Sequence, residues 1–332
     1  MLCNSMKTEK PFNILIADFL SEQSVTQNSI RTYNQMLKNW VHFCISQKID
    51  IRQPRKADVI FFKNYLMKTG KAINTVNLNV TVLKMFFSWL KQNSIYSNIT
   101  EGIRNVRNDN RHLKKYLKED QVNRLLNSIP FNDLEGMRDY CLIMLMVTTG
   151  LRRAEIARLK YKNIIWHQTS LEPPLIKIYR KGNEFHSEFS LSEEIIAPII
   201  EYINYRHRRE NISTFSPLFI SLSKNSYAKQ LQPGSISRIV KTRLSNIGIN
   251  DPKITAHSLR HTAAIIALKH KVDLFAVSRM LGHRSIETTR IYLNAMEEEL
   301  VRNNPAVQEL GRTFQNKVKK GQKTPLFYKV EA

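Results

Sequence analysis

The chain has little of what membrane or secreted proteins require. Its longest strongly apolar run covers residues 140–147 of 332, far short of the ~20 residues that a membrane-spanning helix needs. The opening residues MLCNSMKTEK hold no apolar segment that could serve as a secretory signal. We therefore expect a protein that is cytoplasmic and has no membrane partner.

Cysteine is scarce as well. Cys3, Cys44 and Cys141 are odd in number and far apart, so they form neither a metal-spaced pair nor the framework of a disulfide-rich fold. Thiols in this arrangement are typical of a reducing compartment. The three side chains are expected to be buried and reduced.

Acidic residues are too few to balance the basic ones. The chain carries 51 Lys and Arg against 28 Asp and Glu, which gives a net charge of +23. A field of this sign attracts polyanions, and in a chain without a membrane segment we interpret the polyanion as nucleic acid. The hydrophobic fraction of 42% is high enough for folded cores, so wholesale disorder is excluded.

Three common catalytic motifs are also missing. Gly70-Lys71 is followed by Ala72, so no phosphate-binding GxxxxGK[ST] loop is present, and there is no GxSxG nucleophile elbow. His257 and His261 have a spacing that can bind zinc, but HSLRH lacks the glutamate of HExxH and no third ligand is evident. The sequence therefore predicts no metal and no other cofactor.

The first part of the chain indicates a small helical bundle. Four segments place apolar residues at helical spacing and are joined by short connections. They are PFNILIADFL, SIRTYNQMLKNWVHF, DVIFFKNYLM and NTVNLNVTVLKMFFSWL. These segments predict a helical N-terminal domain over residues 1–98. The weakly periodic residues 99–116 are rich in arginine and lysine, and we interpret them as a basic linker.

The rest of the chain is predicted to be mainly α with a small antiparallel β-sheet. Helical periodicity runs through most of residues 117–310, a second domain. Within it, NIIWHQ, LIKIYR and FHSEFSL are short and rich in β-branched or aromatic residues, and KGNE is a plausible hairpin turn. We expect about three strands there. A polar, basic tail follows over residues 311–332.

The stretch LGHRSIETTRIYL places His283 in a turn after Gly282, nine residues before Tyr292. Taken by itself, it is an ordinary helix-turn-helix. Gly282 would end one helix, Ser285 would cap the next, and Ile291 and Tyr292 would face a core. Whether the histidine and the tyrosine do more than this depends on residues elsewhere.

Three other segments offer the same choice between structure and chemistry. TTGLRRAE places Arg152 beyond the end of an apolar helix, where a helical ion pair with Glu155 would explain it. HSLRH holds His257 and Arg260 on one face of a helix start, and Lys181 lies in the predicted hairpin turn. Each segment by itself is explained by structure.

As a set, these side chains match the needs of phosphoryl transfer. A phosphodiester passing between two alkoxides carries extra negative charge on its non-bridging oxygens. Arginine suits those oxygens because its planar guanidinium donates to two of them and stays ionised. Histidine and lysine can carry protons, and tyrosine can act as the nucleophile, without a metal. The set therefore predicts phosphodiester chemistry.

In their order along the chain, the motifs resemble the tyrosine recombinase (phage integrase) family. TGLRxxE, a hairpin lysine, HxLRH, LGH and a tyrosine nine residues after the histidine follow one another as in that family. The N-terminal helical unit with SIRTY and the basic linker resemble the family's core-binding domain and hinge. The resemblance thus covers nearly the whole chain, and a chance match to the full ordered set is far rarer than one to a short motif.

The resemblance implies a role for each matching residue. Arg152 and Arg260 would hold the scissile phosphate, and His283 would donate to a non-bridging oxygen. Tyr292 would attack to give a 3′-phosphotyrosyl link and a free 5′ hydroxyl. His257 would accept the proton of the tyrosine or help to bind the phosphate.

Two further roles follow from the resemblance. Lys181 would be the general acid for the leaving 5′ oxygen, and Glu155 would orient the cluster. The match departs from the family at the lysine, which usually sits in a turn with glycine on both sides, whereas Arg180 precedes Lys181 here. Lys177 is therefore kept as a second candidate.

The same resemblance implies a two-domain DNA clamp, in which a helical core-binding domain and a tyrosine-recombinase catalytic domain close around double-stranded DNA. It implies a homo-oligomer, the synaptic tetramer on DNA, with NAMEEELVRNNPAVQEL as an element that docks on a neighbour. Accessory DNA-bending proteins are compatible further partners. Religation would need neither metal nor ATP, because the covalent link conserves the energy of the broken bond.

Four functions follow from these expectations. The first choice is a site-specific DNA recombinase, the integrase of a mobile element, and the second is a Xer-like chromosome dimer resolvase. A non-catalytic DNA-binding regulator would have no need of a spaced nucleophile. A type IB topoisomerase would share the chemistry but would relax DNA without a target sequence.

Overall fold

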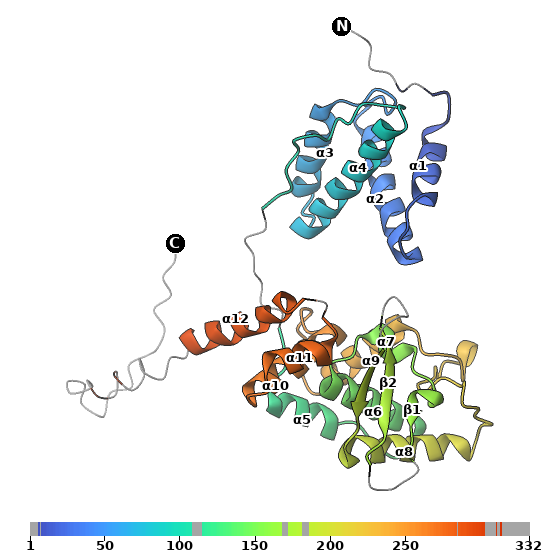
Figure 1. The fold of residues 1–332 in the computed structure, drawn as a ribbon, viewed down its shortest axis with the longest axis vertical. Coiled ribbons are helices and arrows are strands. Elements are labelled where there is room, and N and C mark those ends of the chain that lie inside the picture. Colours follow the sequence, from blue (N-terminus) through green and yellow to red (C-terminus); the bar gives the residue numbers. More distant parts are fainter. Residues whose placement is uncertain are drawn as a thin grey trace. The chain divides into compact units, whose positions relative to one another are not determined.

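The computed structural model describes residues 6, 8–107, 115–167, 172–180, 186–283, 285–302, 310 and 313 (Figure 1). They belong to two compact units, Met1–His112 and Leu113–Ala332, each with a hydrophobic core of its own. Among these residues, no helix combines the length and the hydropathy that crossing a membrane requires.

The described part of Met1–His112 contains four helices, as the sequence predicts. They are α1 (Phe12–Ser21), α2 (Gln27–Ser46), α3 (Lys56–Lys68) and α4 (Ile73–Gln92). Their apolar stripes meet in an aromatic core, where the Trp40 ring stands edge-on to Phe62 with 5.4 Å between centroids. The periodicity that predicts the helices is thus also the surface through which they pack.

Two of the three cysteines lie among the described residues, and both are buried and free. Burial, with the nearby Asp58 charge, raises the pKa of the Cys44 thiol to about 12. Burial also raises the pKa of the Cys141 thiol. Both groups are therefore protonated at neutral pH, and the prediction of buried thiols is confirmed for them. Cys3 lies outside the described residues.

The described part of Leu113–Ala332 is mainly helical with one small sheet, which confirms the predicted fold class (Figure 1). The helices are α5 (Glu119–Asn127), α6 (Leu134–Thr149), α7 (Arg153–Ala157), α8 (Glu193–His207), α9 (Pro233–Asn246), α10 (Ala256–Lys269), α11 (Leu274–Leu281) and α12 (Glu287–Arg302), with the short 3-10 helices η1 (Tyr161–Asn163) and η2 (Lys224–Ser226).

The sheet has three antiparallel strands in the order β1-β2-β3. They are β1 (Ile164–Ile165), β2 (Leu175–Tyr179) and β3 (His186–Ser190). On the central strand, Ile176 pairs with Ile164 on one side and Phe189 on the other. The number of strands agrees with the prediction, whereas the predicted turn KGNE lies outside the described residues.

Helix α6 runs through the core of this unit and packs against α8 and α10. The Asp133 carboxylate caps its start by accepting the backbone N–H of Gly136 at 2.7 Å. Gly150 ends it in the left-handed conformation, with φ of 62°. A Cβ at Gly150 would also lie 2.6 Å from a methyl group of Leu281. Glycine is therefore required where the chain turns from α6 towards α7.

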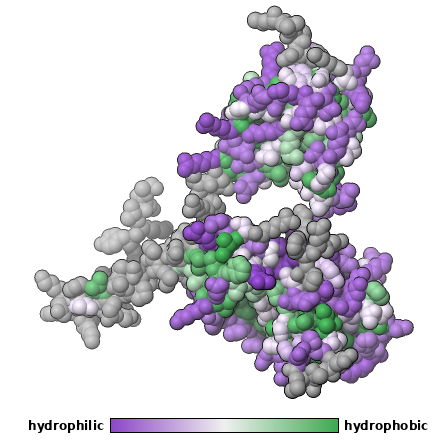
Figure 2. Space-filling model, in the orientation of Figure 1, coloured by the Kyte–Doolittle hydropathy of each residue, from purple (hydrophilic) through white to green (hydrophobic). Residues whose placement is uncertain are grey.

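Helices α10, α11 and α12 pack around a second, smaller core. Tyr292 is 5% exposed within it, whereas Ile291 is 50% exposed. The prediction that both face a core is wrong for Ile291, because neighbouring residues of a helix point about 100° apart. Figure 2 shows patches of apolar surface among the hydrophilic surface of this unit. Phe275 on α11 is one of the large hydrophobic side chains that are exposed.

Candidate active site

Arg152 stands between the end of α6 and the start of α7, and Glu155 holds it. One Glu155 oxygen accepts the Arg152 backbone N–H at 2.8 Å, and the other accepts Nη1 at 2.9 Å. The Glu155 side chain is 3% exposed and the Arg152 side chain 42%. The contact therefore differs from a surface ion pair, because the carboxylate is buried while the guanidinium remains partly exposed. Glu155 orients Arg152 and leaves part of it accessible to an anion.

Arg260 is buried on α10, and the ends of two other helices anchor it. Its Nη1 donates to the carbonyl of Gly150 and its Nη2 to that of Leu281, each at 2.7 Å. These carbonyls follow α6 and end α11, where helix dipoles are negative and favour a cation. Burial, and then the charge of Arg152, lowers the pKa of Arg260 to about 10. The guanidinium is therefore still charged at neutral pH.

Arg180 is a third arginine of the cluster, which the sequence reasoning missed. It donates to the carbonyls of Leu281 and Met280, each at 2.8 Å, and to Ser187 Oγ at 3.0 Å. Its Nη1 lies 3.6 Å from Glu155. In the sequence it is the last residue of the strand-like segment LIKIYR, directly before Lys181, and no pattern there indicates a role for its own side chain. It fastens the end of β2 to the end of α11.

His283 follows the left-handed Gly282 that ends α11. Its Nδ1 lies 2.8 Å from Thr289 Oγ1. Burial, and then the charges of Arg260 and Arg152, lowers the pKa of His283 to about 4. At neutral pH the ring is therefore an uncharged imidazole, which can still donate one hydrogen bond.

Tyr292 lies on α12 inside the same cluster. Its ring is parallel to that of His283, with 6.4 Å between centroids. Its hydroxyl is 2.8 Å from Nδ1 of His261 on α10. Burial raises the pKa of Tyr292, and the charges of Arg260 and Arg152 oppose this rise. The hydroxyl is thus protonated at neutral pH, within a field that favours its ionised form.

His257 borders this cluster from the first turn of α10. Its side chain is exposed, and its ring stands edge-on to that of His261 with 4.6 Å between centroids. His261 is buried, and zinc binding is the only role that its spacing from His257 suggests in the sequence. Its position directly after Arg260 in HSLRH is the sequence feature that indicates a role in the cluster. The described residues contain no group of three His, Cys, Asp or Glu able to hold a metal.

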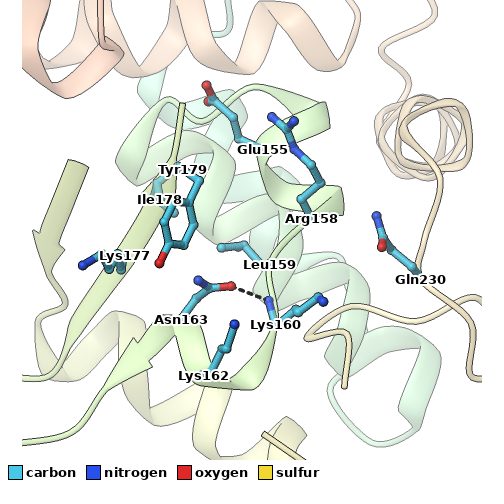
Figure 3. Close-up of a pocket in the computed structure, with 10 residues that line it drawn as sticks. All are labelled: Glu155, Arg158, Leu159, Lys160, Lys162, Asn163, Lys177, Ile178, Tyr179 and Gln230. Carbon is cyan, nitrogen blue, oxygen red and sulfur yellow. Dashed lines mark hydrogen bonds between the residues drawn. The ribbon is translucent and has the colours of Figure 1, made fainter. Parts of the chain in front are cut away.

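Lys181 lies outside the described residues, so its position is not part of the geometry. Lys177, the second candidate, is on β2 with its Nζ 3.4 Å from Glu188 on β3. It lines a cavity of about 450 Å³ beside α7 and β2, together with Arg158 and Lys160 (Figure 3). Glu155 lines the same cavity, so the cavity lies beside the contact between Glu155 and Arg152.

The cluster is suited to bind and attack a phosphate. Arg152, Arg260, His283 and Tyr292 come from four places in the sequence, and the charges of Arg152 and Arg260 act on both His283 and Tyr292. Guanidinium groups bind phosphate oxygens through paired hydrogen bonds. A hydroxyl beside them is placed to act as a nucleophile.

Two family models match the chain. The phage integrase family matches residues 115–299. The phage integrase N-terminal SAM-like domain matches residues 15–94.

Curated relatives match most of the chain. The tyrosine recombinase XerA of Pyrococcus furiosus is 28% identical over 287 residues, which cover 86% of this chain and 89% of the relative. The tyrosine recombinase XerD of Rickettsia prowazekii is 25% identical over 277 residues, which cover 82% and 88%.

Solved structures share the fold. The XerH site-specific recombinase bound to its palindromic difH substrate aligns with a TM-score of 0.72 and 20% identity, over 90% of this chain and 85% of that one. A lambda integrase dimer bound to a COC' core site aligns with a TM-score of 0.63 and 14% identity, over 82% and 95%. At these identities the likeness concerns the fold.

Proposed function

We propose, since the chain belongs to the phage integrase family and is a site-specific tyrosine recombinase, that it cleaves and rejoins double-stranded DNA through Tyr292. The observation that carries this assignment is the cluster itself. The Tyr292 hydroxyl is buried beside Arg260 and Arg152, whose charges act on it, and beside the neutral ring of His283.

In the proposed reaction, Arg152 and Arg260 bind the non-bridging oxygens of the scissile phosphate. The Tyr292 oxygen attacks phosphorus, and the bond to the 5′ oxygen breaks. A 3′-phosphotyrosyl link and a free 5′ hydroxyl result. His283 is neutral at working pH and donates a hydrogen bond to a non-bridging oxygen as charge grows there. Attack by the 5′ hydroxyl of another strand reverses these steps.

Two proton carriers complete the proposal. His257, at the border of the cluster, accepts the tyrosine's proton or binds the phosphate. Lys181 donates the proton that the leaving 5′ oxygen takes up. The cleavage needs no nucleotide, because the phosphotyrosyl bond conserves the energy of the phosphodiester.

DNA is proposed to lie in a clamp formed by two domains. The net charge of +23 supports this partner, because it favours a polyanion. The division into residues 1–98, a basic linker over 99–116, a catalytic domain over 117–310 and a tail over 311–332 remains a prediction. We assign the protein to the cytoplasm, because its proposed substrate is cellular double-stranded DNA.

The active form is proposed to be a tetramer on DNA. Lambda integrase, a protein of the same fold at 14% identity, has been solved as a tetramer bound to a Holliday junction. In this chain, apolar side chains exposed on α11 and around the start of α12 are available for contact with a neighbouring copy; they include Phe275, Ile286 and Ile291. Helix α12 continues to Arg302 and begins the predicted docking segment.

The biological role is proposed to be that of a mobile-element integrase, with a Xer-like chromosome dimer resolvase as the second candidate. The second gains support from the curated relatives, which are Xer recombinases aligned over most of their length. Sequencing the DNA captured as covalent adducts in the native host separates the two. Sites at the ends of an element support an integrase, whereas a single chromosomal site supports a resolvase.

The nucleophile is tested with a pool of random DNA duplexes. We expect wild-type protein to form covalent adducts with selected sequences, and Tyr292→Phe to bind the same DNA without forming any. The reason is that the change removes the hydroxyl and nothing else. Tyr227→Phe is the matched control, because the Tyr227 hydroxyl donates to Glu210 and should be dispensable. Adducts from Tyr292→Phe would show that another tyrosine attacks, and Tyr205 and Tyr227 would be tested next.

A further inference from the structure

His261 is the side chain that meets the hydroxyl of Tyr292. It directly follows Arg260 on α10, is 5% exposed, and places Nδ1 2.8 Å from the phenol oxygen. The ring centroids are 5.3 Å apart and the rings are inclined by 51°. The contact joins residues 31 positions apart, because α10 and α12 pack together.

The phenol is assigned as the donor of this hydrogen bond. Burial raises the pKa of Tyr292, so the hydroxyl keeps its proton at neutral pH. A buried hydroxyl proton needs an acceptor, and a neutral imidazole provides one at the nitrogen that carries no hydrogen. The contact therefore implies the His261 tautomer with its hydrogen on Nε2.

The other two histidines of the cluster are related to Tyr292 in different ways. His257 is exposed, and its ring packs edge-on against that of His261. The His283 ring lies parallel to the tyrosine ring, and its Nδ1 is engaged by Thr289. His261 is thus the histidine placed to direct the hydroxyl.

We propose that His261 is a positioning residue for the nucleophile: it accepts the hydrogen bond of Tyr292 and aims the phenol oxygen at the phosphate held by Arg260. This proposal rests on the proposed function. The backbone carbonyls of Gly150 and Leu281 hold Arg260 in place. His261, the next residue of α10, is held in place by the same contacts. A nucleophile displaced by about 1 Å loses about a hundredfold in rate, so the contact governs cleavage.

The test compares single-turnover cleavage by full-length wild type and two His261 variants. The probe is a nicked duplex with the sequence that wild type captures from the random pool. His261→Phe removes the acceptor and should slow adduct formation by about ten- to a hundredfold, with the Kd for the duplex nearly unchanged. His261→Asn places its amide oxygen near the former Nδ1 and should restore most of the rate, with the wild-type pH profile.

His270→Asn is the matched control. His270 is an exposed histidine at the end of the same helix, 3.1 Å from Glu119, and its variant should cleave like wild type. An asparagine can accept the hydrogen bond but cannot take up a proton. If His261→Asn cleaves as slowly as His261→Phe, accepting the hydrogen bond is not enough, and the positioning role is wrong. If both variants cleave as fast as wild type or faster, the contact restrains the tyrosine or does nothing, and the proposal is equally wrong.

Two safeguards keep the outcomes distinct. Thermal melting shows whether each variant folds, and if His261→Phe does not fold, His261→Asn decides by itself. A wild-type rate and pH profile then uphold the proposal, and a loss beyond tenfold overturns it. Failure of the proposed function would look different, because wild type would form no adduct or Tyr292→Phe would still form one.

Discussion

At the scale of the residue, the protonation state of His283 is set by its surroundings. Burial, and then the charges of the surrounding arginines, lower the pKa of the ring to about 4, whereas an unfolded histidine titrates near 6.5. Between these values the unfolded chain binds a proton that the folded chain does not. The free energy of unfolding therefore falls as pH falls through this window.

This difference predicts a pH dependence that His283→Asn should remove. Between pH 7 and pH 4, wild type is expected to lose about 1 kcal/mol more stability than the variant, a value discounted because the ring is partly exposed. Urea unfolding of the full chain at several pH values measures it. His270→Asn, at an exposed site, should keep the wild-type dependence, and equal slopes for wild type and His283→Asn would contradict the prediction.

The general acid gives a second prediction at this scale. An alkoxide is a poor leaving group and departs best when protonated, so Lys181→Ala should slow cleavage strongly while DNA binding persists. With sulfur in place of the 5′ bridging oxygen, the leaving thiolate has a conjugate acid of pKa about 8.5 by analogy with cysteine. This DNA should restore cleavage by Lys181→Ala.

Two comparisons sharpen this test. Sulfur should not rescue Arg260→Ala, whose defect concerns the non-bridging oxygens. Lys177 is already paired with Glu188 across the sheet, so its ammonium group would have to leave this ion pair to reach DNA. Rescue of Lys177→Ala and not of Lys181→Ala would reverse the assignment, and rescue of neither would place the general acid elsewhere.

At the scale of the element, the end of α11 holds two arginines of the cluster in place. Leu281 offers one carbonyl to both Arg260 and Arg180. Gly282 then turns the chain with φ of 63°, and a Cβ there would lie 2.5 Å from the Arg180 guanidinium. This glycine is needed for its backbone conformation and for the space that it leaves.

Gly282→Ala should therefore lower the free energy of unfolding for two reasons. The left-handed conformation costs about 1–2 kcal/mol for alanine, and displacing Arg180 from its carbonyls should cost about 1–3 kcal/mol more. Gly248→Ala is the matched control, because Gly248 has φ of 81° and open space around its Cβ position. Urea unfolding should show the larger loss for Gly282→Ala, and equal losses would mean that Arg180 adapts freely.

At the scale of the whole molecule, charge should dominate the affinity for DNA. With 51 basic residues against 28 acidic ones, binding should weaken steeply with salt, by about 0.9 log unit per log unit of salt for each phosphate neutralised. Deletion of residues 311–332, a basic segment, is expected to lower that slope. Fluorescence anisotropy with a labelled duplex measures the affinity at each salt concentration. An unchanged slope would show that residues 311–332 do not contact DNA.

The sequence by itself determined the helices, the small sheet and the candidate residues. Apolar periodicity is a local property, so the four N-terminal helices and most helices of Leu113–Ala332 could be placed from it. Arg152, Arg260, His283 and Tyr292 could be named because each belongs to a short motif whose order resembles a known family.

Only the tertiary structure decided which of these groups touch. His261 and not His257 bonds the Tyr292 hydroxyl across 31 positions, and Arg180 reaches Leu281 across 101. Such contacts depend on how separate helices pack and where their carbonyl ends meet. Local patterns carry no record of that packing, because it is set by the volumes and hydrogen-bonding needs of residues far apart in the chain.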